Sequence, residues 1–120
     1  IKLKSKSQVL NAMEDLKEET EEMAKSFAHR RMVMHEGLNS LPGVTAPEPE
    51  GAFYILADIA GTGMTDIEFA DRALTEARVQ VIPGSLMKGG EGLIRLSYAT
   101  SLENIHQGIE RLKQWLSSIM

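Results

Sequence analysis

The stretch LIRLSYA, residues 93–99, decides the fold of this chain. Large apolar side chains recur at every second position on one side of it, at Ile94, Leu96 and Tyr98. The other side carries Arg95 among Leu93, Ser97 and Ala99. Such a two-residue period is typical of a half-buried β-strand. We therefore expect a strand here, with Arg95 on its less apolar face.

Two further strands are expected before this stretch. Residues 52–59 alternate in the same way, and residues 79–82 form a short β-branched run that Pro83 ends. A glycine-rich loop, residues 84–92, separates the second run from residues 93–99. The three runs are expected to form one small sheet.

Capping residues mark two helices. Thr65 with Glu68 three residues later forms a capping-box pattern, which predicts a helix over residues 66–78. Ser101 is a suitable N-cap for a final helix that ends at Ser118. Both segments place apolar residues at helical spacing, so each should bury one face.

A third helix is expected over residues 8–39, and it is long for the chain. Its 32 residues would extend about 48 Å at 1.5 Å per residue, whereas a globule of 120 residues has a radius of gyration of about 13.5 Å. Its apolar face comprises Val9, Met13, Leu16, Met23, Phe27, Met34 and Leu38. Because no later segment could cover that whole stripe, we expect the chain to be part of a longer protein.

The element order is long helix, strand, helix, strand, strand, helix. It predicts an α+β fold in which helices cover a small three-stranded sheet. The turn-rich residues 41–51 divide residues 1–40, the long helix, from residues 41–120, the small domain.

Composition excludes several classes of function. The 13 basic and 17 acidic side chains leave a net charge of −4 without a basic cluster, which argues against a nucleic-acid partner. The chain lacks cysteine and any apolar run of membrane-spanning length, which favours a cytoplasmic protein without a membrane partner. His29, His35 and His106 match no metal motif, so we expect no metal site.

Two features could bind an anion. The loop at residues 84–92 offers glycine backbone amides and Lys88, but it matches no phosphate motif, and a wide connection between strands is the simpler interpretation. Arg95 could hold a carboxylate through two parallel hydrogen bonds. The strand pattern taken alone favours an ordinary arginine that reaches into solvent.

Three motifs in order resemble the C-terminal domain of fold-type I, class I/II pyridoxal-phosphate aminotransferases of the aspartate and aromatic type. They are PEGAFY at residues 49–54, VIPGS at residues 81–85 and IRLSYA at residues 94–99. HRR at residues 29–31 and IERL at residues 109–112 fit the same pattern. The long helix resembles the one that runs between the two domains of those enzymes.

The resemblance implies that Arg95 binds the α-carboxylate of an amino-acid or 2-oxo-acid substrate and that Gly51 lies near that substrate. It also implies a homodimeric parent enzyme with a large pyridoxal-phosphate domain. The family's S-x-x-K lysine has no counterpart here, because Ser85 and Lys88 match the letters in a loop of the wrong domain. We therefore expect the 120 residues alone to hold no catalytic residue, bind no cofactor and be inactive.

Alternatives remain open at this point. The long helix could belong to a stand-alone assembly or regulatory module that pairs through its apolar stripe. The loop at residues 84–92 could make a small anion-binding domain. The same domain could also come from a pyridoxal-phosphate lyase or synthase.

Overall fold

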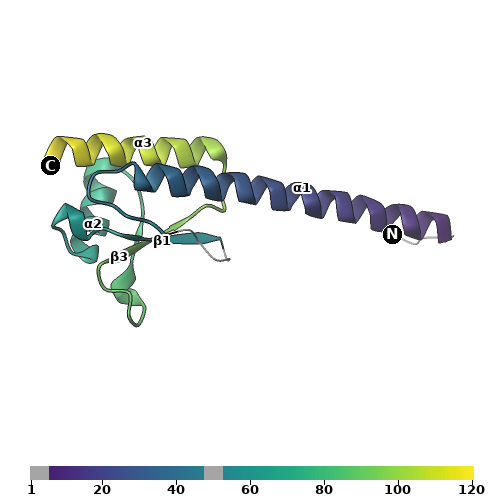
Figure 1. Ribbon diagram of the computed structural model, residues 1–120, viewed down its shortest axis with the longest axis horizontal. Coiled ribbons are helices and arrows are strands. Elements are labelled where there is room, and N and C mark those ends of the chain that lie inside the picture. The colour runs from purple at the N-terminus through teal and green to yellow at the C-terminus, as the bar shows by residue number, and fades with distance from the viewer. Residues whose placement is uncertain (1–5, 48–52) are drawn as a thin grey trace.

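The computed structural model describes residues 6–47 and 53–120 and shows an α+β fold (Figure 1). Its main elements are α1 (Lys6–Asn39), β1 (Tyr54–Asp58), α2 (Asp66–Arg72), β2 (Ile82–Pro83), β3 (Leu93–Ser97) and α3 (Leu102–Ile119). The fold class expected from the sequence is confirmed.

The three strands form an antiparallel sheet with the order β1-β3-β2. β3 is therefore the central strand, and Arg95 is its middle residue. Leu56 of β1 lies opposite Arg95 on one side, and Ile82 of β2 lies opposite it on the other. The arginine is thus flanked by neighbouring strands on both sides.

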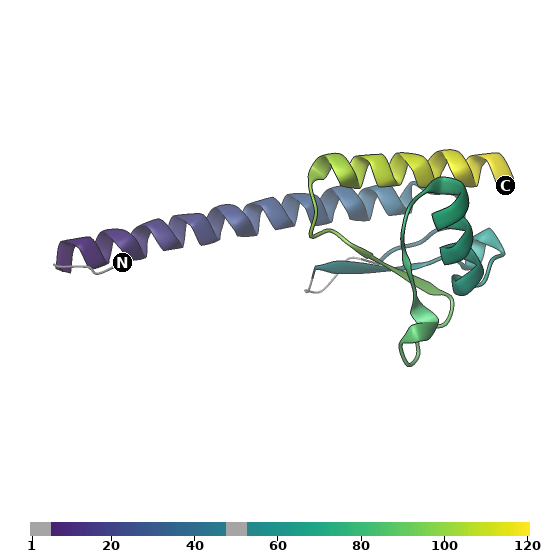
Figure 2. The same cartoon turned by 180° about the vertical axis from the view of Figure 1, so that it is seen from behind.

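Helices cover only one face of this sheet. Figures 1 and 2 show α3 and the C-terminal half of α1 side by side above it. The face beneath them is apolar and fully buried at Ile55, Ala57 and Ile94. The opposite face carries Arg95 and remains open, as the alternation of residues 93–99 predicts.

The caps that begin two helices are those expected from the sequence. The Thr65 side chain accepts a hydrogen bond from the Glu68 backbone N–H at 3.1 Å. Ser101 does the same for Asn104 at 3.1 Å. These bonds satisfy donors that a helix N-terminus leaves unpaired, which fixes where α2 and α3 begin.

Two boundaries differ from expectation. The helix expected to reach residue 78 becomes a π-helical turn at Ala73–Ala77 and ends at Arg78, whose φ of 58° is left-handed. Leu74, an apolar residue within this turn, is exposed. The run expected at residues 79–82 pairs with β3 only at Ile82, and the pairing extends one residue further to Pro83. Pro83 has no backbone N–H, so the ladder does not continue beyond it.

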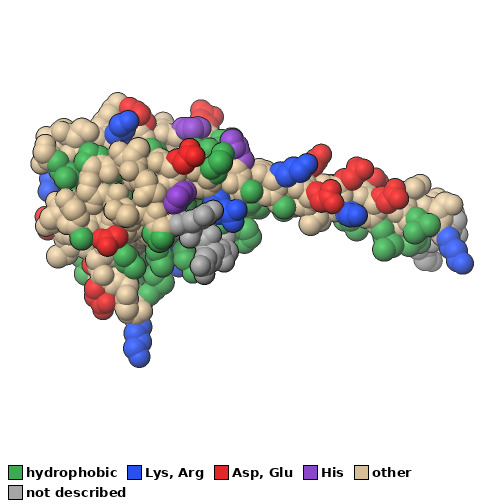
Figure 3. Space-filling view, in the orientation of Figure 1, with side chains coloured by type: hydrophobic (Ala, Val, Ile, Leu, Met, Phe, Trp, Pro, Cys, Tyr) green, Lys and Arg blue, Asp and Glu red, His purple; other side chains and the backbone are tan. Residues whose placement is uncertain are grey.

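α1 is one continuous helix of 34 residues, which confirms the long helix. It extends far beyond the sheet, so the molecule measures 64 × 30 × 23 Å with a radius of gyration of 18.7 Å. Figure 3 shows acidic side chains along one edge of the extension and apolar ones along the other. The division at residue 40 stays a prediction. No helix of the described part is both long and apolar enough to cross a membrane.

Candidate functional site

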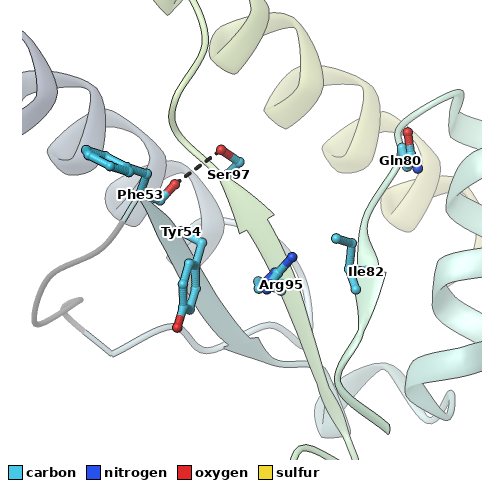
Figure 4. A pocket seen from close by; sticks show the side chains of 6 residues that line it. All are labelled: Phe53, Tyr54, Gln80, Ile82, Arg95 and Ser97. Atoms are coloured by element: carbon cyan, nitrogen blue, oxygen red, sulfur yellow. Dashed lines mark hydrogen bonds between the residues drawn. The ribbon is translucent and has the colours of Figure 1, made fainter. Parts of the chain in front are cut away.

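The open face of the sheet contains a pocket of about 470 Å³ around Arg95 (Figure 4). Its lining residues come from all three strands and from the segments just before β1 and β2: Phe53, Tyr54, Gln80, Ile82, Arg95 and Ser97. The pocket therefore combines apolar and aromatic walls with one guanidinium, one amide and two hydroxyls. Such a mixture suits an organic anion.

Arg95 is half-buried and is free to bind an external anion. Within residues 6–47 and 53–120, the only ion pair joins Arg72 to Glu76, so no described carboxylate neutralises Arg95. Its guanidinium carbon lies 5.1 Å from the centre of the Tyr54 ring. A guanidinium carries five N–H donors, and an arrangement against a ring face leaves its planar edge available for a carboxylate.

An aromatic cluster borders the pocket where β1 begins. The Phe53 ring centre lies 4.8 Å from that of Phe27 in α1 and 6.5 Å from that of Tyr98. The Phe53 carbonyl accepts hydrogen bonds from the Tyr98 N–H at 2.9 Å and from the Ser97 hydroxyl at 3.2 Å. These contacts hold Phe53 in place although its side chain is 55% exposed.

Arg30 joins α1 to the strand ends beside this cluster. Its guanidinium donates a hydrogen bond to the Thr100 carbonyl at 2.7 Å and lies 4.1 Å from the centre of the Phe27 ring. One side chain thus connects the long helix, the aromatic cluster and the segment that follows β3. Sequence reasoning noted Arg30 only as part of the HRR run, because Thr100 is 70 residues away.

The glycine-rich loop is closed, which corrects the expectation of a wide connection. A Cβ placed on Gly84 would lie 2.0 Å from the Gly90 carbonyl oxygen, so only glycine allows this approach. The buried Asp66 carboxylate accepts hydrogen bonds from the backbone N–H of Ser85 at 2.8 Å and of Gly92 at 3.3 Å. The Ser85 side chain, followed by these amides, lowers the Asp66 pKa although burial opposes the shift. The loop amides at Ser85 and Gly92 therefore bind the protein's own carboxylate.

The structure describes only some of the site residues that the sequence predicts. Arg95 lies in the pocket, although this placement alone does not test its role. Gly51 lies outside the described residues. Across residues 6–47 and 53–120, no three histidine, aspartate or glutamate side chains come together to hold a metal ion. The sequence did not identify Tyr54 as a site residue. The alternation of residues 52–59 predicts only that Tyr54 and Phe53 point to different faces of the strand. The distance from Tyr54 to Arg95 is set by the pairing of β1 with β3.

A family model for aminotransferase class I and II matches residues 5–112, which is most of the chain. The chain belongs to the aminotransferase class I and II family. It is 42% identical over 97 residues to aspartate aminotransferase of Pyrococcus horikoshii, which covers 80% of this chain and 25% of that protein. The chain thus spans about a quarter of the length of the curated relatives it matches.

Solved aminotransferase structures share the fold as well as the sequence. The aromatic aminotransferase of Pyrococcus horikoshii matches with a TM-score of 0.80 and 41% identity, over 85% of this chain and 27% of that one. Aspartate aminotransferase of Thermus thermophilus, in a structure with maleate, matches with a TM-score of 0.76 and 36% identity, over 89% of this chain and 27% of that one.

Aminotransferases of this family use pyridoxal phosphate, which their lysine binds as a Schiff base. The described residues that line the Arg95 pocket include no lysine. Lys88 is exposed on the glycine-rich loop, outside that pocket. The pocket therefore lacks the amine that would bind the cofactor covalently, and its guanidinium is suited to an anion.

Proposed function

We propose that this chain is the C-terminal, substrate-carboxylate-binding part of a pyridoxal-phosphate aminotransferase. The intact enzyme would transfer an amino group between an amino acid and a 2-oxo acid. The large cofactor-binding domain would be its principal partner, and the enzyme would act as a homodimer. Family membership and the share of the relatives that the chain covers support this proposal.

The observation that carries the proposal is Arg95 itself. It lies at the centre of the open sheet face, is half-buried, and has no carboxylate partner among the described residues. A guanidinium in such a position is costly unless an anion binds it, because partial burial weakens its hydration. The α-carboxylate that every amino acid and 2-oxo acid carries matches its bidentate geometry.

The chain's part in the reaction would be to bind and orient. The cofactor, when bound by the large domain, supplies the electron sink for the chemistry. Arg95 would fix the α-carboxylate, and the apolar walls of the pocket would exclude water as the domains close. The maleate of the Thermus structure, a dicarboxylate in a relative, supports recognition of this chemical group.

Replacement of Arg95 in the intact enzyme tests the proposal. Arg95→Ala should lower kcat/KM by an amount equivalent to a loss of about 2–5 kcal/mol in transition-state stabilisation, because one partner of a desolvated charge pair is lost. Arg95→Lys should lower kcat/KM less, because the charge remains but the two parallel donors are lost. Steady-state kinetics with a series of amino acids would measure both effects.

Arg111→Ala is the matched control. Arg111 is an exposed arginine on α3 that donates a hydrogen bond to the Arg78 carbonyl. α3 covers the face of the sheet opposite the open one (Figure 1). Its loss should change kcat/KM by less than about 0.5 kcal/mol, as expected for an exposed side chain. If Arg95→Ala had as small an effect as Arg111→Ala, Arg95 would be an ordinary solvated arginine and the proposal would be wrong.

A further inference from the structure

We propose that Tyr54 is a positioning residue, whose ring face holds the Arg95 guanidinium in the orientation that binds a carboxylate. The inference rests on the proposed function of Arg95 and adds a second residue to it. Tyr54 would act through Arg95 and need not touch the substrate. Its signature would be a change in carboxylate affinity without a loss of fold.

The sheet register places the two side chains together. In the β1–β3 ladder Tyr54 lies opposite Ser97, and Leu56 lies opposite Arg95, so Tyr54 is the diagonal neighbour of Arg95 on the open face. Diagonal neighbours on one face remain within reach of aromatic and long side chains. The 5.1 Å between the guanidinium carbon and the ring centre lies within the range of a cation–π contact.

The ring is suited to hold an arginine that must remain available. A carboxylate partner would occupy the guanidinium N–H donors and compete with the ligand. A ring face attracts the charge through its π electrons and leaves the planar edge of the guanidinium free. Holding the long side chain in one orientation also reduces the rotamer entropy that it loses on binding.

The two residues paired with Arg95 in the sheet cannot provide this restraint. Leu56 and Ile82, opposite it on the flanking strands, are apolar and offer neither charge nor hydrogen bond. Figure 4 draws Tyr54 beside Arg95, with its hydroxyl at the far end of the ring. The contact therefore uses the ring face, and phenylalanine should replace tyrosine without loss.

The test uses the intact enzyme with maleate and 3-phenylpropionate as carboxylate probes, each titrated by calorimetry. Tyr54→Leu should raise the dissociation constant about two- to fivefold, the usual range for one cation–π contact at a partly exposed site. It should raise KM similarly and change kcat little, because Tyr54 touches no reacting atom. Tyr54→Phe should remain within about twofold of wild type, since phenylalanine keeps the ring face.

Leu56→Met is the matched packing control, because Leu56 lies opposite Arg95 on the same strand as Tyr54 but does not line the pocket. It should leave both dissociation constants unchanged. An effect as large as that of Tyr54→Leu would mean that any change beside Arg95 matters, which would overturn the inference. Thermal unfolding of each variant checks that the fold is intact.

Arg95→Lys distinguishes a failure of the proposed function of Arg95 from a failure of the inference about Tyr54. If it leaves probe binding unchanged, the proposed function of Arg95 fails. If it weakens binding while Tyr54→Leu does not, only the inference about Tyr54 fails. If Tyr54→Phe weakens binding as much as Tyr54→Leu, the hydroxyl and not the ring face is responsible, and the inference is also overturned.

Discussion

The two halves of α1 have the same backbone and very different surroundings. In the projecting half, residues 6–26, the apolar row is exposed at Val9, Leu10, Met13, Leu16 and Met23. In the packed half, residues 27–39, Met34 and Leu38 are buried against the core. Both halves carry apolar residues at helical spacing, so spacing alone does not decide which of them is covered.

A helical partner makes the difference. α3 lies alongside the packed half only, and the two helices approach closely at Gly37, where an added Cβ would lie 2.9 Å from Ile109. The projecting half has no such neighbour among the described residues. Because most helical stability in proteins comes from packing, the two halves should differ in every measure of local stability.

Hydrogen exchange should show the largest difference. In a monomer of the 120-residue chain, backbone amides of the packed half should exchange more slowly than those of the projecting half, by a factor on the order of 10³ or more. Exchange read by mass spectrometry on peptides from each half measures this ratio. Equally slow exchange in both halves of a proven monomer would contradict the comparison.

Protein concentration sharpens the same measurement. An exposed apolar row tends to self-associate, so exchange in residues 6–26 should slow if a second copy covers them. Sedimentation velocity at the same concentrations identifies the dimer. The same two measurements also test the alternative in which the long helix belongs to an assembly module that pairs through its apolar stripe.

Truncation of one leucine in each half should separate them by several kcal/mol. Leu38 is 0% exposed, and Leu38→Ala should lower the free energy of unfolding by about 2–5 kcal/mol. Leu16 is 63% exposed, and Leu16→Ala should change it by less than about 0.5 kcal/mol. Urea unfolding followed by circular dichroism measures both, and similar values would mean that the projecting half is packed as well.

Charged groups outside α1 should determine how the stability of the chain responds to acid. Asp66 has a folded pKa below its ordinary value of 3.8, chiefly because the Ser85 side chain and two backbone amides bind its charged form. Its stabilising contribution is therefore complete above pH 3.8 and is lost as pH falls through the lower folded pKa. Unfolding should become easier in that range.

Asp66→Asn should remove part of this acid dependence and lower stability near neutral pH by about 1–3 kcal/mol, because buried amides lose a charged acceptor. Glu76, whose pKa is lowered by Arg72 and then by the Trp115 side chain, should account for a further part. Urea unfolding between pH 2 and pH 7 measures both. A wild-type pH dependence in Asp66→Asn would mean that this carboxylate is not the group that titrates.

Two glycines give the smallest and most specific test of the helix contact. Gly37→Ala in α1 should destabilise by about 1 kcal/mol, because the clash with Ile109 exceeds the helical preference of alanine. Gly108→Ala in α3 should stabilise by about 0.5–1 kcal/mol, because its Cβ would meet no atom within 4 Å. Thermal unfolding resolves shifts of this size, and two effects of the same sign would contradict the close approach at Gly37.

Most of the fold could be predicted because local rules governed it. The caps at Thr65 and Ser101 and the alternation of residues 93–99 depend on neighbours within a few positions, and each was correct. The π-helical turn at Ala73–Ala77 and the closed loop at residues 84–92 were missed. The closed loop depends on contacts between residues that lie apart in sequence, such as Asp66 with Gly92. The sequence shows no local signal for the π-helical turn.

The candidate site divides in the same way. The sequence by itself placed Arg95 on the open face, because side-chain direction in a strand has a period of two. Only the tertiary structure decided that Tyr54 lies beside Arg95, that Arg30 reaches Thr100, and that α3 packs along the C-terminal half of α1 (Figure 1). Strand pairing and helix packing set these distances, and they depend on which surfaces meet after the chain has folded.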